Sequence, residues 1–461
     1  MSIIDSGNTI CAPATGKGGA ITIVRLSGDE ALTIVDKIFI AKKKGQKLVE
    51  SASHRIYFGD LYDGDLILDE VLVSVFKGNK SYTGETSVEI SLHASPYILQ
   101  RTLALLVQQG ARIAEPGEFS MRAFLHGKFD LAQAEAVGDL IASSSKSAHH
   151  TAMRQLKGQY SNQLKVLRQQ LLDFASLIEL ELDFAEEDVE FADRKRFTQL
   201  VKQIDKEVAR LIHSFAIGNV LKEGIPVAIV GKPNVGKSTL LNTLLHEDKA
   251  IVSDIAGTTR DIIEDSINVN GVLFRFIDTA GIRESDDLVE SLGIERTYKK
   301  IGEANIVLLL VDAADIKSTE DINNQVKKAQ IKIDTSSQEL IIVINKIDQT
   351  PLLGLDDSCK YHYVAISAKN NIQALETALN NYVQQFNIQD QSIVTNARHL
   401  EALEHTHESL QTILQAFEAN IPTDLIAIDV RTALHYLGSI TGEIGNDELL
   451  GNIFGKFCIG K

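Results

Sequence analysis

Apolar side chains recur at steps of three or four residues along two parts of the chain. Between residues 164 and 182 they fall on one face of a long helix. No proline occurs between Pro116 and Pro226, as expected of helices, because a proline inside a helix costs about 3 kcal/mol. Helical spacing returns near the end of the chain. We therefore expect an α-helical bundle domain built from residues 121–221 and 386–461.

Short runs that resemble strands, separated by turn residues, fill the first 120 residues. We expect strands at residues 20–26, 55–61, 70–76 and 87–92. A helix is expected to begin at Pro96 and to end at Gln109, because Gly110 follows it. Residues 1–120 are therefore predicted to form a small α+β domain.

Residues 222–385 alternate apolar strands with helices. Near-continuous apolar runs suit strands that are covered on both faces of a parallel sheet, and they lie at residues 226–230, 305–312, 339–345 and 361–366. Residues 261–268 and 272–278 alternate around Asn270-Gly271, which predicts a hairpin. The simplest architecture inserts this α/β domain into the helical domain.

A glycine-rich segment lies between the first of these strands and an apolar helix. Gly231-Lys232-Pro233-Asn234-Val235-Gly236-Lys237-Ser238 fits the pattern of a phosphate-binding loop in the context that the pattern requires. The two glycines allow backbone N–H groups to point at a phosphate. Lys237 would place a cation on the outer phosphates, and Ser238 would offer an oxygen to Mg²⁺. The segment predicts nucleotide binding.

Three further motifs follow the ends of later strands. In Asp278-Thr279-Ala280-Gly281, the acid can reach the Mg²⁺ shell and a glycine amide can sense the γ-phosphate. In Asn345-Lys346-Ile347-Asp348, Asp348 can accept two hydrogen bonds from guanine, whereas adenine offers no such pair. Ser367-Ala368-Lys369 is expected to touch the base. The four motifs in this order resemble the GTPase family.

The residue that follows Asp278-Thr279-Ala280-Gly281 is Ile282, where many GTPases carry a glutamine that orients the attacking water. Another group must therefore act. The candidates in the next segment are Arg283, Glu284, Asp286, Asp287 and Glu290. Asn234 and residues 253–260 are rich in oxygen atoms, and a cage of such atoms could hold a monovalent cation that offsets transition-state charge.

Three signatures outside the nucleotide-binding motifs carry a closer resemblance. They are Ser81-Tyr82-Thr83-Gly84-Glu85-Thr86, the run from Pro116 to Ala136 that contains Gly127-Lys128, and the tail Phe457-Cys458-Ile459-Gly460-Lys461. Over its whole length the chain resembles the MnmE/TrmE family of tRNA modification GTPases. The resemblance implies a multidomain protein: a folate-binding α+β N-terminal domain, an α-helical bundle domain and an inserted α/β P-loop GTPase domain.

The resemblance also implies partners and a reaction. The chain would form a homodimer whose GTPase domains close on each other when K⁺ and GTP are bound. It would act with the flavoprotein MnmG, as a heterotetramer, on certain tRNAs. The product would be an aminomethyl or carboxymethylaminomethyl group at C5 of the wobble uridine. A tetrahydrofolate derivative of the 5-formyl or 5,10-methylene type would supply the one-carbon unit, and glycine or ammonium would supply the nitrogen.

Site residues are carried over position by position from the same resemblance. The residues implied to bind GTP are Asn234, Val235, Gly236, Lys237, Ser238, Thr239, Ser253, Asp254, Ile255, Ala256, Gly257, Thr258, Thr259, Asp278, Thr279, Ala280, Gly281, Asn345, Lys346, Asp348, Ser367, Ala368 and Lys369. Mg²⁺ would be held by Ser238 and Thr259, and K⁺ by Asn234, Ser253, the backbone carbonyl of Ile255, and Thr258. Glu290 would orient water, and folate would contact Arg25, Glu85, Lys128 and Lys461.

Composition narrows the class of protein further. The 461 residues carry a formal net charge of −16, with 44% hydrophobic and 23% charged residues. These values exclude a disordered chain and argue against a basic protein that coats nucleic acid. Three cysteines without a CxxC pair fit a reducing cytoplasm and give no zinc site. We expect neither a membrane span nor a signal peptide, because no apolar run is long enough and the N-terminus lacks a basic region.

Other interpretations stay open from the residues alone. A ribosome-assembly GTPase that acts as a binding switch would share the four motifs, but it would need an RNA-binding module, usually basic. A folate-dependent aminomethyltransferase with an acquired nucleotide domain would not need four intact motifs. Cys458 is either a nucleophile near Lys461 or a small buried apolar residue.

Overall fold

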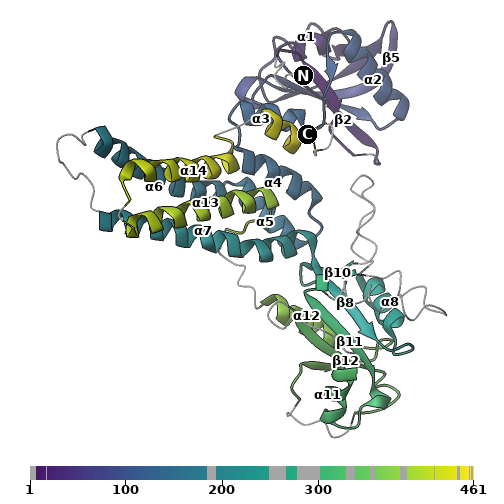
Figure 1. Cartoon of the computed structure of the whole chain (residues 1–461). Helices are drawn as coiled ribbons and strands as arrows, with labels where there is room; N and C mark the ends of the chain where they lie inside the picture. Colours follow the sequence, from purple (N-terminus) through teal and green to yellow (C-terminus); the bar gives the residue numbers. More distant parts are fainter. Residues whose placement is uncertain are drawn as a thin grey trace.

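Three bodies of secondary structure are arranged along the chain in the computed structural model (Figure 1). They are a sheet with two covering helices, a bundle of long helices, and a second sheet flanked by helices. The structure describes residues 7–16, 18–183, 194–248, 266–277, 302–328, 338–352, 359–384, 392–419, 421–443, 447–455, 457 and 460. A multidomain architecture is thus confirmed.

The N-terminal body contains a seven-stranded sheet in the order β3-β4-β5-β6-β2-β1-β7. Its strands are β1 Ile10–Pro13, β2 Ile21–Ser27, β3 Phe39–Ala41, β4 Arg55–Asp63, β5 Leu66–Phe76, β6 Ser87–His93 and β7 Arg112–Ile113. All pairs are antiparallel except β1 with β7. Helices α1 Ala31–Asp36 and α2 Pro96–Gln108 contribute to the core on one face of the sheet. The four expected strands and the expected helix are present within a few residues.

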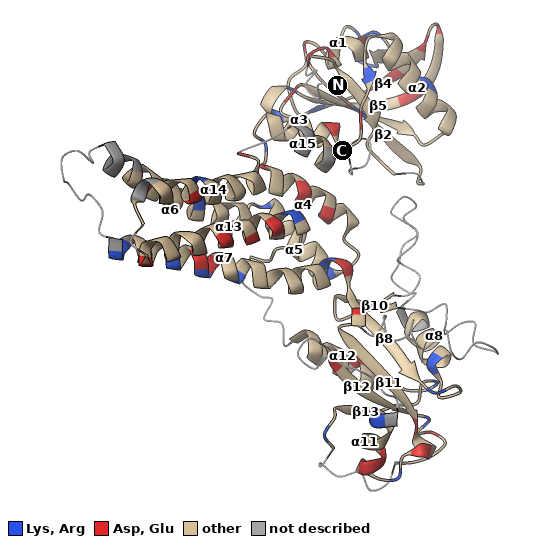
Figure 2. Ribbon diagram, in the orientation of Figure 1, with Lys and Arg blue, Asp and Glu red and all other residues tan. Residues whose placement is uncertain are grey.

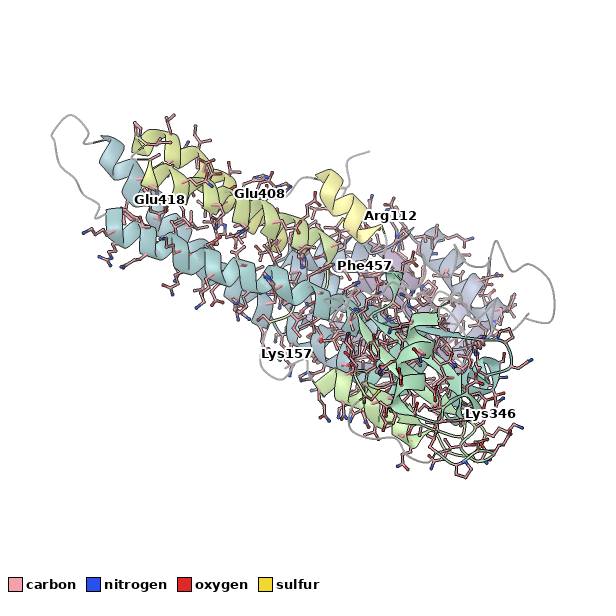
Figure 3. All side chains as sticks on the ribbon, turned by 60° about the horizontal axis from the view of Figure 1, so that its bottom comes forward. Arg112, Lys157, Lys346, Glu408, Glu418 and Phe457 are labelled. Atoms are coloured by element: carbon pink, nitrogen blue, oxygen red, sulfur yellow. The ribbon has the colours of Figure 1, made fainter. Side chains whose placement is uncertain are left out.

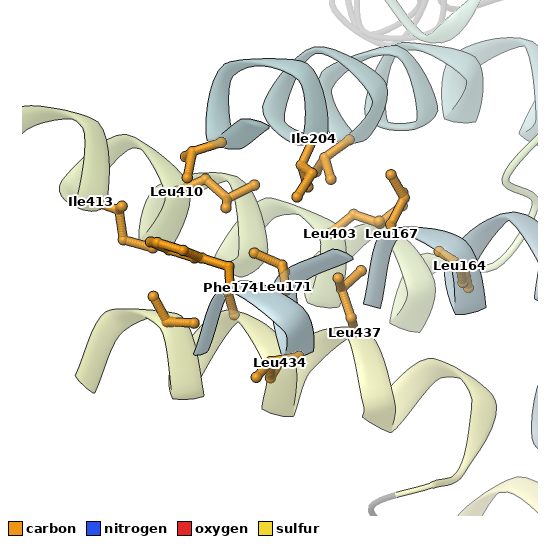
Figure 4. Packing of buried hydrophobic residues seen from close by; sticks show 14 of the residues in the cluster. Leu164, Leu167, Leu171, Phe174, Ile204, Leu403, Leu410, Ile413, Leu434 and Leu437 are labelled. Atoms are coloured by element: carbon orange, nitrogen blue, oxygen red, sulfur yellow. The ribbon is translucent and has the colours of Figure 1, made fainter. Parts of the chain in front are cut away.

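Over the residues that the structure describes, the bundle consists of five helices that contribute to one apolar core and a further helix, residues 146–156, that packs beside them. Its elements are α4 Leu131–Ala142, α5 Lys146–Leu156, α6 Gln159–Asp183, α7 Arg194–Glu223, α13 Ala397–Glu418 and α14 Thr423–Thr441. Figure 4 shows Leu164, Leu167, Leu171 and Phe174 of α6 packed among side chains of α7, α13 and α14. The predicted apolar face of a long helix over residues 164–182 is therefore confirmed for these side chains.

The third body has a six-stranded sheet in the order β13-β12-β11-β8-β10-β9. Its strands are β8 Ile225–Gly231, β9 Ser266–Val269, β10 Val272–Ile277, β11 Ile306–Asp312, β12 Glu339–Asn345 and β13 Tyr363–Ala365. The helices are α8 Lys237–Asp248, α11 Thr319–Lys328 and α12 Gln373–Gln384, with a short 3₁₀ helix, η3, at Ala313–Asp315. Only β9 with β10 is antiparallel.

The burial of its central strands is what a parallel sheet covered by helices on both faces requires. Six of the seven residues of β11 are buried, so both of its faces are covered. Strand β8 has no charged residue, and β11 and β12 each have one, at a strand end, as Figure 2 shows. The predicted hairpin is confirmed as well, because Asn270 and Gly271 have φ of 52° and 88°, as a type I′ turn requires.

The second sheet follows α7 in sequence, and the chain re-enters the bundle core at Val394. There the Val394 N–H donates to Ser214 Oγ of α7 at 3.1 Å, and Gln155 Nε2 of α5 donates to the Ile393 carbonyl at 2.9 Å. At its other end, α5 meets the β9–β10 turn, because Ser147 Oγ donates to the Gly271 carbonyl at 2.6 Å. Helix α5 therefore contacts both the turn and the returning segment.

The C-terminal segment packs beside the N-terminal body and also against the first helix of the bundle, because Leu450 and Phe454 share an apolar cluster with Leu131 of α4. Helix α15 Asp447–Phe454 packs with α3 Glu118–Leu125 (Figure 2). A Cβ on Gly117 would overlap the Phe454 carbonyl, and one on Gly460 would overlap the Pro13 carbonyl. Gly460 therefore lies beside the last residue of β1. Within the described ranges, no helix combines the length and the apolar character that a membrane crossing needs.

Candidate functional site

The glycine-rich segment forms the turn between β8 and α8, as its sequence pattern predicts. A Cβ on Gly231 would lie 2.6 Å from the Leu310 carbonyl oxygen, and a Cβ on Gly236 would overlap the amide nitrogen of Asn345. Gly236 also has a φ of 100°, which L side chains rarely adopt. Both glycines are therefore required, because the loop is pressed against the ends of β11 and β12.

Lys237 lies at the start of α8, and its ammonium lies over this loop. Its Nζ donates to the carbonyls of Gly231 at 2.7 Å and Lys232 at 2.9 Å. Burial lowers the pKa of Lys237 from its ordinary value. A cation held over a loop that leads into a helix N-terminus is an arrangement that binds phosphate groups.

Asn345 joins the loop to a second segment. Its Nδ2 donates to the Val235 carbonyl at 2.8 Å, and its Oδ1 accepts from the Ala368 N–H at 2.9 Å. Thr243 Oγ1 of α8 donates to the Ala368 carbonyl at 2.6 Å. The phosphate-binding loop, the end of β12 and residues 367–369 are therefore fixed together, as the order of the motifs predicts.

The remaining described residues of this region surround that junction. Asp348 and Lys369 are exposed, so their charged groups are accessible to a ligand. The buried hydroxyl of Ser367 has no hydrogen-bond partner among the described residues. An unpartnered buried hydroxyl beside a polar loop is compatible with a bound polar group. Val235 is buried, and Thr239 lies half-buried in the first turn of α8.

Asp312, which the sequence analysis did not single out, belongs to this site. Lys346 Nζ donates to Asp312 Oδ2 at 2.7 Å and to the Asn234 carbonyl at 2.8 Å. Burial acts to raise the pKa of Asp312, but the Lys346 hydrogen bond and charge outweigh it, so the pKa lies below its ordinary value. The sequence signal that could have identified Asp312 is its position as an acidic residue at the end of a buried apolar strand.

The structure describes two of the residues that are expected to hold metal ions. Asn234 and Ser238 are described and exposed at the phosphate-binding loop. Amide and hydroxyl oxygens are hard donors, so these two residues fit K⁺ and Mg²⁺. The other expected nucleotide, metal and catalytic residues lie outside the described residues, namely Ser253, Asp254, Ile255, Ala256, Gly257, Thr258, Thr259, Asp278, Thr279, Ala280, Gly281 and Glu290.

The N-terminal body carries a second cluster of the expected residues. Arg25 of β2 pairs across the sheet with Glu89 of β6, with NH2 2.8 Å from Glu89 Oε1. Its guanidinium lies 5.3 Å from the centre of the Tyr82 ring and 5.7 Å from that of Phe119. Arg25 is therefore held in place by an ion pair and two aromatic rings rather than free on the surface.

Glu85 is engaged within the protein. Arg122 NH1 donates to both carboxylate oxygens at 3.1 Å, and Ser27 Oγ donates to Oε2 at 2.7 Å. Both side chains of the Glu85–Arg122 pair are buried. Arg122 is the residue that the sequence analysis missed here, although it lies inside one of the quoted signatures.

Lys128 and the end of the chain approach the same region. Lys128 Nζ donates to the Asn79 carbonyl at 2.7 Å. The Tyr82 ring, which carries Arg25 on one side, lies 5.9 Å from the Phe129 ring, which follows Lys128. Gly460 lies against Pro13, next to Ala12, the strand partner of Arg25. Cys458 and Lys461 themselves lie outside the described residues.

Two family models match nearly the whole chain. A model of the MnmE helical domain matches residues 131–458, and a model of the N-terminus of the GTP-binding protein TrmE matches residues 9–128. The second match runs past the boundary that we expected at residue 120. This fits the packing of α3, whose Ser120 hydroxyl lies 2.9 Å from the Tyr82 hydroxyl.

Curated relatives match at full length. The tRNA modification GTPase MnmE of Flavobacterium psychrophilum is 50% identical, over 98% of this chain and 99% of the relative. The proteins of the same name from Bacteroides thetaiotaomicron and Cytophaga hutchinsonii are 49% and 47% identical, over 98% and 100% of this chain and 99% of each relative. The chain therefore belongs to the MnmE (TrmE) family of tRNA modification GTPases.

Proposed function

We propose that this protein hydrolyses GTP between β8 and α8 and uses that reaction in the modification of tRNA. The observation that carries the nucleotide part is the junction at Asn345, which fixes the phosphate-binding loop to residues 367–369. Asp348 would select guanine, because a carboxylate accepts from two neighbouring N–H groups of that base. Membership of the MnmE family supports the proposed role in tRNA modification.

Different residues of this chain would have separate roles in GTP hydrolysis. Lys237 would neutralise charge on the outer phosphates, and Ser238 with Thr259 would hold Mg²⁺. Asn234, Ser253, Ile255 and Thr258 would hold K⁺, a positive charge that offsets charge on the transferring phosphoryl group. Ile282 cannot orient water, so we assign that role to Glu290.

We further propose that a tetrahydrofolate derivative binds the cluster around Arg25. The guanidinium of Arg25 and the ammonium groups of Lys128 and Lys461 suit the carboxylates of a folate tail. The position of Gly460 beside Pro13 supports a contribution from Lys461. The Glu85 carboxylate already accepts three hydrogen bonds, so a pterin would share its remaining capacity.

The partners follow the family resemblance. We propose a homodimer in which the GTPase domains of two copies meet when GTP and K⁺ are bound. We propose MnmG as the flavoprotein partner and the wobble uridine of certain tRNAs as the substrate. A ribosome-assembly switch is the rival function, and no described feature favours it.

Nucleoside analysis of tRNA decides between these functions. We expect tRNA from cells that lack this protein to lose the modified wobble uridine, and the wild-type gene to restore it. A gene carrying Asp348→Asn should not restore it, because GTP would no longer be selected. Intact wobble modification in the deletion strain, together with accumulated ribosomal precursors, would refute the proposal and favour the ribosome-assembly switch.

A further inference from the structure

Two residues of the nucleotide site share an unfavourable backbone conformation and a hydrogen bond. Asn234 and Lys346 have φ of 64° and 67°, the left-handed region that residues other than glycine rarely adopt. Within the described part of the chain, only two other residues that are not glycine have a positive φ, namely His54 and Asn270. Such conformations persist only where surrounding contacts enforce them. Here the contact is the 2.8 Å hydrogen bond from Lys346 Nζ to the Asn234 carbonyl.

Asp312 supplies the second partner of the same ammonium. In the parallel register Asp312 lies opposite Asn345, so it is adjacent to Lys346 at the carboxyl edge of the sheet. Its Oδ2 accepts from Lys346 Nζ at 2.7 Å, and its Oδ1 accepts from the Ala314 N–H at 3.0 Å, which caps η3. Figure 3 shows Lys346 at the outer end of this body, away from Glu408 and Glu418 of the bundle.

We propose that Asp312 is a positioning residue for guanine-nucleotide binding, which holds the Lys346 ammonium on the carbonyl of Asn234. The inference rests on the proposed GTP site. An ammonium has three N–H donors, and two of them are committed to Asp312 and Asn234. No other described residue accepts from the third, which would point at the nucleotide in a fixed direction. Asp312 thereby fixes the aliphatic stem of Lys346 and the turn of the phosphate-binding loop together.

The sign of the effect separates positioning from general electrostatics. Removing a negative charge close to a phosphate site should strengthen binding of an anionic nucleotide if only the electrostatic field matters. Removing Asp312 should instead weaken binding, because Lys346 loses the partner that orients it. Weaker binding after the loss of an acid therefore points to positioning.

The test is the dissociation constant of GDP, measured by calorimetry on the full chain, together with kcat and KM for GTP. Asp312→Asn keeps a side-chain oxygen that can cap Ala314, but it removes the charge and replaces the oxygen that accepts from Lys346 Nζ by an NH₂ group. We expect about a tenfold weaker affinity for GDP and a higher KM with kcat within about twofold, since the interaction is made in the ground state and the transition state alike. The preference for GTP over ITP should not change, because the 2-amino group that distinguishes the two bases is assigned to Asp348 and not to Asp312.

Asp315→Asn is the matched control. Asp315 lies three residues later and pairs with Lys232 of the same loop at 3.0 Å, but the two side chains are 43% and 57% exposed. An ion pair as exposed as this one contributes little, so its loss should leave the affinity within about twofold. Asp312→Glu keeps the charge and should recover most of the affinity. The Lys346→Met variant should bind GDP with the same reduced affinity whether or not it also carries Asp312→Asn.

Unchanged or tighter binding of GDP by Asp312→Asn would overturn the proposal, as would an equal loss in Asp315→Asn or an additive loss in the double variant with Lys346→Met. If Asp312→Asn does not fold, Asp312→Glu decides, because wild-type affinity supports positioning by charge and a tenfold loss contradicts it. A wild-type protein that binds no GDP would instead refute the proposed function.

Discussion

Asn345 donates from Nδ2 to the carbonyl of Val235 at 2.8 Å, so a hydrogen bond joins the end of β12 to the phosphate-binding loop. The neighbouring Gly236 has no room for a side chain, because a Cβ there would overlap this same amide nitrogen. The geometry of the loop therefore depends on the contact between Asn345 and Val235.

Gly236→Ala tests that dependence. The added methyl must displace the Asn345 amide, and the backbone must keep a φ of 100° that alanine disfavours. We expect affinity for GDP to fall at least about tenfold, as measured by calorimetry. Gly302→Ala is the control, because no described residue lies within 4 Å of its added methyl and its φ is not positive. Equal affinity in both variants would contradict the account.

Potassium dependence tests the proposed cation site. GTP turnover should be at least about tenfold faster in KCl than in NaCl at the same ionic strength, because the cation offsets transition-state charge. Asn234→Ala should reduce that difference, whereas Lys232→Gln in the same loop should keep it. Equal turnover of the wild-type protein in the two salts would remove the cation site from the account.

Folate binding should depend on both ends of the chain. Arg25→Met or deletion of Lys461 should weaken binding of 5-formyltetrahydrofolate about tenfold each, since each removes a charge-assisted contact to a carboxylate. GTP hydrolysis should stay within about twofold. Arg55→Met is the control, because Arg55 is an exposed arginine on β4 of the same sheet. Wild-type folate affinity in the Arg25 and Lys461 variants would refute the assigned contacts.

Glu135 governs the acid stability of the bundle. Burial acts to raise the pKa of Glu135, but His399 and Arg398 outweigh it and lower the pKa to about 2. His399 Nε2 lies 2.6 Å from Glu135 Oε2, and Arg398 Nε donates to Oε1 at 3.1 Å. Because the folded pKa is depressed, this stabilisation is fully present above pH 4.5 and is lost as the pH falls toward about 2.

Glu135→Gln should therefore destabilise the bundle by about 3 kcal/mol at pH 7, because the partly buried Arg398 and the buried His399 lose their carboxylate. Thermal unfolding followed by circular dichroism should show a lower Tm than wild type, and the difference should shrink below pH 4. Glu408→Gln is the control. Glu408 also pairs with a histidine, but its side chain is 74% exposed, so the change should be under about 1 kcal/mol. A difference that persists unchanged at pH 3 would contradict the assignment.

The elements that the sequence predicted well are those that depend on local pattern. Apolar runs predicted β8, β11 and β12, and Asn270-Gly271 predicted the hairpin turn, because these signals need only neighbouring residues. Strand β7 has two residues and β1 has four, which is too short for an alternating pattern to stand out. They form because β1 pairs on one side with β2, the next strand, and on the other side with β7, which lies far along the chain.

The candidate site shows the same difference between features that follow from local sequence and features that depend on distant contacts. Consecutive motifs identified the residues of the phosphate-binding loop and Asn345. Asp312 and Arg122 escaped notice because their importance lies in partners 34 and 37 residues away, Lys346 and Glu85. The position of Gly460 against Pro13 could not be derived from spacing either, since it depends on how α15 packs on α3.

Nucleotide selectivity of Asp348→Asn tests the central claim most directly. A carboxylate at this position accepts two N–H groups of guanine, whereas an amide can donate to the carbonyl that xanthine carries in place of the guanine amine. Hydrolysis should be measured with GTP and with xanthosine triphosphate for both proteins. The account predicts that the wild type prefers GTP and that the variant prefers xanthosine triphosphate, a reversal of at least about 100-fold. A variant that keeps the wild-type preference for GTP would contradict it.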